Sequence, residues 1–444
     1  MSNKRAVSRR DFLKIAGASA AGAMVAAHLP QSASRVVAAD KKPIKVTLWT
    51  HVAKDEQDWF ASEWKVSAAK NAPDYDITFE VVPMAHADLH AKALANMTTG
   101  TDLPDIMGLT HDFWPKFLKG TLVEDNLASI DDAIADVKDN ALGLSAWSKD
   151  AKLYGMREDI ASTVYWYRDD LLKASGITTP IATWDDFMAA GKSLKAPAKY
   201  MMPVIIDQLF FNYPVISQLA GTYWTADGKW SLNTPETLKV ITYLKKGLDD
   251  KVFFPVGQGD FWGSKFFPSG EVAGTIMPSW YGTFVLFPAI PDQKGKWRIQ
   301  NMPKWGTGGH VSSSVWGGTA WTFSKNSPNV DVVLKVAKGM FFDTEARVRY
   351  NDVAKSLPAW KPALADPRVQ NQTEPFLGDQ PWKKVFFDGL ADTVLAIQNK
   401  ADFDVAPIAD DGWTKFMAGK MGAQEYLDSV DSQLKDLGIP LAKG

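Results

Sequence analysis

Apolar residues recur with two different periods along the first part of the chain. Residues 44–49 alternate polar and apolar side chains before ending in an apolar pair, which predicts a strand. Residues 55–70 place aromatic side chains on one helical face, which predicts a helix. The same pattern predicts a second strand at 77–82, a helix at 89–97 and a third strand beginning at 104–107. This alternation indicates an open, largely parallel α/β sheet.

The middle of the chain is less regular. Residues 154–168 alternate again, and the Tyr-Trp-Tyr run at 165–167 has high strand propensity. Thr183 is the predicted N-cap of a helix, because threonine can accept a backbone hydrogen bond there. Glycine, proline and asparagine predict loops at 199–235 and 255–283. The other predicted elements are helices at 169–174, 238–248 and 329–342, a strand at 317–324, and a helical C-terminal third.

The N-terminus has the pattern of an export signal. Residues 8–14 read SRRDFLK, with two adjacent arginines before a bulky apolar pair, and an alanine- and glycine-rich run covers 15–27. This pattern is typical of a twin-arginine signal peptide over residues 1–39, which a receptor recognises and which is then removed. The mature chain is expected to begin near Asp40. This route exports proteins that have already folded. We therefore expect the mature chain to lie outside the cytoplasmic membrane.

Charge and cysteine content narrow the function classes. Six basic residues against one acidic residue give residues 1–39 a net charge of +5, so the chain's net −2 leaves −7 for residues 40–444. An acidic surface argues against nucleic acid as a partner. The chain has no cysteine, which excludes thiol chemistry, thiolate metal sites and a lipid-anchored cysteine. Without a lipid anchor the exported protein would diffuse freely and would need an outer membrane to retain it, which indicates a Gram-negative periplasm. No later apolar run is long enough to span a bilayer.

Several short motifs occur in a characteristic order. They are the strand at 44–49, GTDLPDI at 100–106, GTLVED at 120–125, LYGM at 153–156 with YRDDLL at 167–172, TWDDF at 183–187, and GEVAGTI with SW at 270–280. In this order and spacing the chain resembles the extracellular solute-binding proteins of ATP-driven sugar importers, the group that includes maltose-binding protein. The resemblance covers nearly the whole mature chain.

The resemblance implies an α/β, two-lobe periplasmic-binding-protein fold of type II. Each lobe would hold a mostly parallel sheet flanked by helices, and the expected mature length of about 405 of the 444 residues also favours two domains. The first lobe is predicted at 40–155 plus 319–365, and the second at 156–318 plus 366–444. The protein would be a periplasmic, monomeric, non-enzymatic component of an ABC importer without a cofactor. It would capture a carbohydrate or polyol by hinge closure and deliver it to the membrane permease.

The ends of the predicted strands supply the first site candidates. In open α/β sheets, ligands lie beyond the carboxyl ends of the strands. This rule selects Trp49 and His51 after the first strand, and His111, Asp112 and Trp114 after the third. Sugars need flat aromatic faces for their C–H groups and carboxylates for their hydroxyls. The resemblance implies the same role for the aspartate of the His-Asp pair, although Asp112 could instead cap a helix at 113–119.

The remaining candidates lie near the predicted crossings between the lobes. The resemblance places an aromatic residue against the ligand at the position of Trp280 and Tyr281, and the 18 tryptophans suggest an aromatic-lined cleft. The other candidates are Glu158 and Asp159 beside Arg157, Trp316 before two glycines, and, more weakly, Trp224 and Trp360. Trp49 could equally be a strand-end core residue, Trp114 could instead pack its turn, and residues 157–159 could be an exposed ion cluster at a hinge.

Two other functions fit the same sequence. An exported carbohydrate-active hydrolase would need two carboxylates across the scissile bond, for which Glu158 and Asp159 are the candidate pair. The same fold could also bind a quaternary ammonium compound by cation–π attraction, or a polyol with or without a phosphate. His86 and His90 have the spacing of one helix face, but surface or capping roles fit them better, so no metal site is predicted.

Overall fold

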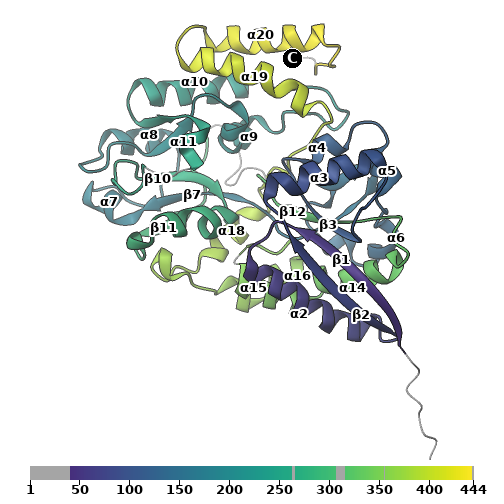
Figure 1. The fold of residues 1–444 in the computed structure, drawn as a ribbon. Helices are drawn as coiled ribbons and strands as arrows, with labels where there is room; N and C mark the ends of the chain where they lie inside the picture. The colour runs from purple at the N-terminus through teal and green to yellow at the C-terminus, as the bar shows by residue number, and fades with distance from the viewer. Residues whose placement is uncertain (1–40, 263–265, 307–315, 355, 443–444) are drawn as a thin grey trace, which may run out of the picture. The chain divides into compact units, whose positions relative to one another are not determined.

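The computed structural model describes residues 41–262, 266–306, 316–354 and 356–442, and Figure 1 shows the arrangement of their helices and strands. The predicted signal peptide and its cleavage site lie outside these residues. None of the helices in the described ranges is long and apolar enough to cross a lipid bilayer.

A five-stranded sheet forms the first layer of the structure. Its strands are β1 (Lys42–Thr50), β2 (Tyr75–Pro83), β3 (Ile106–Thr110), β6 (Gly155–Arg157) and β12 (Thr319–Phe323). They lie in the order β2-β1-β3-β12-β6. β1 pairs in parallel with β2 and β3, whereas β12 is antiparallel to both β3 and β6. Four strands therefore run one way and β12 runs against them.

The second set of strands repeats this plan. It contains β7 (Thr163–Arg168), β8 (Met202–Ile205), β9 (Phe253–Val256), β10 (Gly274–Pro278) and β11 (Trp297–Gln300). β7 lies between β10 and β11 and is antiparallel to both. β8 pairs in parallel with β9, and a parallel bridge from Tyr200 to Val272 links the segments that precede β8 and β10. Here β7 is the reversed strand: its three-stranded sheet, β10-β7-β11, has only antiparallel pairings, whereas β8 and β9 form a separate parallel pair.

The two reversed strands show how the chain passes between the sheets. β6 of the first sheet leads to β7 of the second, and β11 of the second leads to β12 of the first. The chain thus changes sheet between residues 157 and 163 and between residues 300 and 319. The residue limits of the two lobes stay predictions. A separate short hairpin pairs β4 (Ser148–Lys149) with β5 (Lys152–Leu153).

Helices cover both faces of the first sheet. One face buries Val46, Leu48 and Trp321 against α2 and α14, and the opposite face buries Trp49 and Leu109 against α3. Alternate residues of β1 point to opposite faces, as the strand periodicity requires. The helices of this layer are α2 (Lys54–Asn71), α3 (His86–Thr99), α4 (Trp114–Phe117), α5 (Leu122–Asn126), α6 (Asp131–Ile134), α14 (Val330–Phe341), α15 (Thr344–Ala354) and α16 (Lys361–Leu364).

Two further apolar clusters enclose the second set of strands. Tyr165 and Tyr167 of β7 face one cluster, and Val164 and Trp166 face the other. Figure 1 shows α19 and α20 lying over α10 at the C-terminus. The helices here are α7 (Asp169–Ala174), α8 (Trp184–Lys192), α9 (Tyr213–Ala220), α10 (Pro235–Asp249), α11 (Gln258–Trp262), α12 (Ser279–Tyr281), α13 (Phe287–Ala289), α17 (Pro367–Gln370), α18 (Trp382–Leu390), α19 (Asp402–Met417) and α20 (Ala423–Asp436). Short 3₁₀ turns include η3 (Leu209–Asn212), which precedes α9.

The predicted loops at 199–235 and 255–283 are only partly correct, because each range also contains regular elements. The first contains β8, η3 and α9, and the second contains α11, β10 and α12. β8 and β10 are buried along their whole length, so they lack the alternation that marks a half-exposed strand. Pro214 occupies the first turn of α9, where proline costs no hydrogen bond, so proline content did not indicate a loop there.

The predicted cap of α8 is confirmed and is open to measurement. The backbone N–H of Asp186 donates to the Thr183 hydroxyl oxygen at 3.1 Å. We expect Thr183→Ala to lower the free energy of unfolding by about 1 kcal/mol, because it leaves this N–H without its side-chain partner. Urea unfolding measures the change. Thr183→Ser keeps the hydroxyl and should retain most of the stability; equal losses in both variants would contradict the capping role.

Candidate functional site

The site lies where the strand ends of the first sheet meet the chain crossings. β1, β2 and β3 are parallel, so the residues that follow them gather at one edge. Thr110 at the end of β3 pairs with Thr319 at the start of β12, and Arg157 at the end of β6 pairs with Ala320. This register brings His51, the helix start at His86, the segment at 111–112 and the crossings at 158–159 and 316–318 to the same edge.

The segment Trp316-Gly317-Gly318 connects this edge to the second sheet. The backbone N–H of His111 donates to the carbonyl oxygen of Gly318 at 3.0 Å. The indole N–H of Trp280 donates to the carbonyl oxygen of Trp316, also at 3.0 Å. Gly317 has φ +91°, and a Cβ there would lie 2.9 Å from the Trp280 indole nitrogen. Glycine therefore allows both the backbone conformation and the close approach of Trp280.

Four aromatic residues form what we call the aromatic cluster: Phe211, Trp262, Trp280 and Trp316. The rings of Trp262 and Trp280 are nearly parallel, with centroids 6.2 Å apart, and Trp280 and Trp316 are 6.1 Å apart. The Phe211 ring meets the rings of Trp262 and Trp316 edge-on, with centroid distances of 5.7 and 5.2 Å. The four rings therefore contact one another in a closed circuit. Trp262 is 37% exposed, and the others are half-buried. Phe211, Trp262 and Trp280 follow β8, β9 and β10, so they share the carboxyl edge of these strands.

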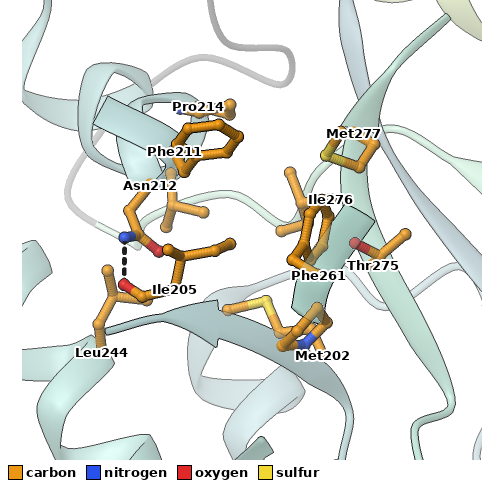
Figure 2. Close-up of a pocket in the computed structure, with 12 residues that line it drawn as sticks. Met202, Ile205, Phe211, Asn212, Pro214, Leu244, Phe261, Thr275, Ile276 and Met277 are labelled. Carbon is orange, nitrogen blue, oxygen red and sulfur yellow. Dashed lines mark hydrogen bonds between the residues drawn. The ribbon is translucent and has the colours of Figure 1, made fainter. Parts of the chain in front are cut away.

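A small cavity lies behind Phe211 and does not add to the site. Its volume is about 20 Å³, and it is lined mainly by apolar side chains of β8, β10 and α9 (Figure 2). Figure 2 shows Phe211 and Phe261 on opposite sides of this space, with Ile276 and Met277 contributed by β10. The volume suits about one water molecule and cannot hold a sugar ring.

Three histidines cluster at the edge of the first sheet. The ring centroid of His86 lies 4.9 Å from that of His51 and 4.8 Å from that of His90. Burial lowers the pKa of His51 to about 3 and that of His90 to about 4. Asp112 is exposed, with its Oδ1 3.9 Å from the Nε2 of His86. Among the described residues, no group of three histidine, aspartate or glutamate side chains is arranged to hold a metal ion.

His111 lies between the two halves of the site. Its imidazole Nε2 is buried without a hydrogen-bond partner, and the ring meets Trp147 edge-on at 5.9 Å. Burial, with a smaller effect of the Arg157 charge, lowers the pKa of His111 to about 3. The side-chain amide of Gln398 donates to the His111 carbonyl oxygen. His111 is therefore neutral at neutral pH.

The acids of the first crossing belong to a buried charge cluster, not an exposed ion cluster. Glu158 is 5% and Asp159 is 6% exposed. The indole of Trp321 donates to Glu158 Oε2 at 2.7 Å, and the backbone N–H of Thr319 donates to Asp159 Oδ1 at 3.2 Å. Burial, followed by the nearby charge of Glu56, raises the pKa of Glu158 well above its usual range. Both carboxylates already serve internal hydrogen bonds, which does not suit a pair that must flank a scissile bond.

The structure divides the predicted site residues into two groups. The first group gathers at the described edge and crossings: His51, His111, Asp112, Asp159, Trp280 and Trp316. The second group lies in the core: Trp49, Trp114, Glu158, Trp224, Tyr281 and Trp360. Asp112 does not cap α4, because Phe113 precedes that helix and no side chain caps it. The side chain of Asp112 is thus left free for another partner.

Core packing explains why the second group does not reach the site. The indoles of Trp224 and Trp360 donate to Asp402 and Thr344, respectively. Trp49 packs with α3, and the ammonium of Lys92 covers its ring at 4.2 Å from the centroid. Trp114 is fully buried, as is Tyr281, which stacks on Phe261. These residues hold the helices behind the site in place.

Three residues of the site were not predicted: Phe211, Trp262 and His86. The two aromatic residues follow short buried strands that the sequence pattern did not indicate. His86 has the helical spacing to His90, but its partner Thr110 is 24 residues away in the sequence. A strand-end rule applied to β8 and β9 would have selected both aromatic residues.

Comparisons with known proteins agree with this architecture. A family model for bacterial extracellular solute-binding proteins matches residues 53–343. The arabinooligosaccharide-binding protein of Bacillus subtilis (strain 168) is 31% identical over 310 residues, which cover 66% of this chain and 69% of that protein. The lactose-binding protein of Rhizobium radiobacter is 27% identical over 58% of this chain and 61% of its own length. The chain thus spans less than two thirds of the latter relative.

Solved structures show the same fold at low sequence identity. The GacH receptor of Streptomyces glaucescens GLA.O, solved unliganded and with acarbose, has a TM-score of 0.70 and 16% identity, covering 90% of this chain and 100% of that chain. The fold is therefore the predicted α/β, two-lobe periplasmic-binding-protein fold of type II. Given the family match over residues 53–343, the chain belongs to the bacterial extracellular solute-binding protein family.

Proposed function

We propose that this protein is the periplasmic solute-binding component of an ABC importer and that it captures a neutral oligosaccharide. The observation that carries the proposal is the aromatic cluster, because its three neighbouring, partly exposed indoles offer flat apolar surface on which sugar rings stack. The relatives named for arabino-oligosaccharide and lactose binding support the same ligand class. Export by the twin-arginine route, which the pattern at 8–14 predicts, is part of the proposal.

The chemistry of the two sheet edges suits a sugar. The C–H faces of sugar rings stack on aromatic side chains, and hydroxyl groups bind carboxylates, imidazoles and backbone carbonyls. The aromatic cluster supplies the first kind of contact, and Asp112 and the histidines supply the second. Closure of two lobes around a ligand is an established behaviour of periplasmic binding proteins. In this proposal the closed, liganded form docks on the permease, acts as a monomer and changes no covalent bond in its ligand.

A binding panel tests the proposal. Isothermal titration calorimetry with arabinotriose, lactose, glucose, a polyol and glycine betaine should show binding of at least one oligosaccharide. We expect Trp280→Ala to weaken that binding by about 2 kcal/mol, or about 30-fold, because buried aromatic anchors dominate binding energies. Phe387→Ala is the matched control, since this exposed phenyl on α18 lies outside the aromatic cluster. Unchanged affinity in Trp280→Ala would contradict the assigned site, and release of cleaved sugar would contradict the binding role.

The closed circuit of rings favours one other ligand class. The rings of Phe211, Trp262, Trp280 and Trp316 contact one another in a closed circuit, and clustered aromatic rings also bind quaternary ammonium groups by cation–π attraction. Glycine betaine in the panel distinguishes the two. Binding of betaine without binding of any saccharide would replace the carbohydrate proposal.

A further inference from the structure

The histidines at the edge of the first sheet form a hydrogen-bond circuit with Thr110. His90 Nδ1 lies 2.7 Å from the carbonyl oxygen of His86, which can only accept, so this nitrogen carries the hydrogen. The backbone N–H of Thr110 donates to His90 Nε2 at 2.9 Å, so that nitrogen carries none. The neutral tautomer of His90 is therefore fixed by its neighbours.

Thr110 and Asp112 together favour one hydrogen position on His86. The Thr110 hydroxyl lies 3.0 Å from His90 Nε2, which accepts, and 3.1 Å from His86 Nε2. If the hydroxyl shares the His90 Nε2 lone pair with the backbone N–H of Thr110, His86 Nε2 donates to the hydroxyl oxygen. Asp112 Oδ1, 3.9 Å from the same Nε2, favours a hydrogen there because of its negative charge. His86 Nδ1 is then a lone-pair acceptor, and the described residues give it no partner.

The exposure of these side chains shows which of them are buried in the fold and which can contact a ligand. His90 is 1% exposed and holds α3 against the end of β3. The side chains of His86 and Asp112 are 44% and 59% exposed, at the same carboxyl edge as the site. The Nδ1 of His51, whose ring meets His86 edge-on, is buried without a partner. The exposed imidazole of His86, with Nδ1 as an acceptor beside the Asp112 carboxylate, suits a ligand that brings hydroxyl donors.

We propose that His86 is a specificity-determining residue whose Nδ1 accepts a ligand hydroxyl beside Asp112, so that this edge selects neutral sugars and rejects acidic ones. The inference rests on the proposed carbohydrate function and defines the ligand class further. His86 Nδ1 and the Asp112 carboxylate are adjacent acceptors and therefore bind hydroxyl donors. A uronate or a sugar phosphate would instead place a second negative charge beside Asp112, which disfavours its binding. His86 acts as a binding residue here, and His90 with Thr110 positions it.

Substitutions of His86 test the acceptor role. Titration calorimetry with arabinotriose and lactose compares the wild type, His86→Leu and His86→Gln. We expect His86→Leu to weaken binding of the bound sugar at least tenfold, and His86→Gln, which keeps an acceptor, to stay within about threefold. Urea unfolding checks that both variants remain folded. Monodeoxy analogues of the bound sugar add a sharper test, since for the analogue lacking the recognised hydroxyl the wild type and His86→Leu should bind equally.

The substitution Asp112→Asn tests whether the Asp112 carboxylate disfavours the binding of acidic sugars. The wild type should prefer the neutral sugar over its uronic-acid analogue by at least tenfold, and Asp112→Asn should narrow that preference. Unchanged affinity in a folded His86→Leu protein, or equal wild-type binding of neutral and acidic sugars, would overturn this inference and leave the proposed function standing. Absence of any saccharide binding to the wild type would instead overturn the proposed function.

Discussion

Replacing Arg347 with methionine is expected to lower the free energy of unfolding by about 3–5 kcal/mol at pH 7, because it removes a cation from a buried charge cluster. Arg347 lies on α15 and is 0% exposed. Its guanidinium donates to the carbonyl oxygen of Glu158 at 2.7 Å and covers the ring of Tyr350 at 4.0 Å from the centroid. Methionine replaces the length of the side chain and none of these polar interactions.

The acids around Arg347 explain the size of the expected effect. Burial, with repulsion from Asp159, raises the pKa of Glu56 to about 8, while the charge of Arg347 opposes that rise. Arg347 also opposes the rise in pKa of Glu158 and Asp159. Without Arg347, these carboxyl groups keep their burial and their pKa values rise further, and the buried carbonyl oxygen of Glu158 loses its guanidinium partner. Since Glu158 and Asp159 form the first chain crossing, losing the Arg347 guanidinium should also make the backbone of this crossing less firmly fixed at the site.

Urea unfolding at pH 7 measures the change. Arg368→Met is the matched control, because Arg368 pairs with Glu345 and Asp366 at the surface, where ion pairs contribute little. The control should leave the unfolding midpoint unchanged within error. A similar midpoint for Arg347→Met and the wild type would show that the cluster does not depend on this cation.

The fold was predictable wherever a helix or strand has one exposed face. α2 and α3 have buried and exposed faces, β2 alternates half-buried and exposed positions, and the sequence pattern located all three. β8 and β10 are four- and five-residue runs buried on both faces, which periodicity cannot distinguish from apolar loop segments. The alternating run at 154–168 was a harder case, because it is two strands, β6 and β7, that belong to different sheets.

The site was predictable only in part, because residue type does not say which way a side chain faces. Trp280 and Trp360 look alike in the sequence. The indole of Trp280 donates to a crossing segment, whereas that of Trp360 donates to Thr344 in the core. Phe211 and Trp262 depend on strands that were missed. The role inferred for His86 depends on Thr110, a contact made by the fold and not by neighbouring residues.

Replacing His111 with phenylalanine should make the protein relatively more stable at acid pH. Burial lowers the pKa of His111 to about 3 in the folded state, against about 6.5 in the unfolded chain. Below pH 6.5 the unfolded state therefore binds a proton that the folded state does not, so His111 costs stability as the pH falls. Phenylalanine does not titrate and keeps the edge-on contact with Trp147.

The informative quantity is the difference in unfolding free energy between the two proteins at two pH values. Between pH 7.5 and pH 5, this difference should shift by about 2 kcal/mol in favour of His111→Phe. Other titrating groups, such as Asp402, whose pKa burial raises to about 6, act equally in both proteins and cancel. Phe117→Leu, a non-titrating change on the neighbouring α4 whose ring contacts Trp114, should show a difference from wild type that is independent of pH. A pH-independent difference for His111→Phe as well would mean that His111 is protonated in the folded protein as readily as in the unfolded chain.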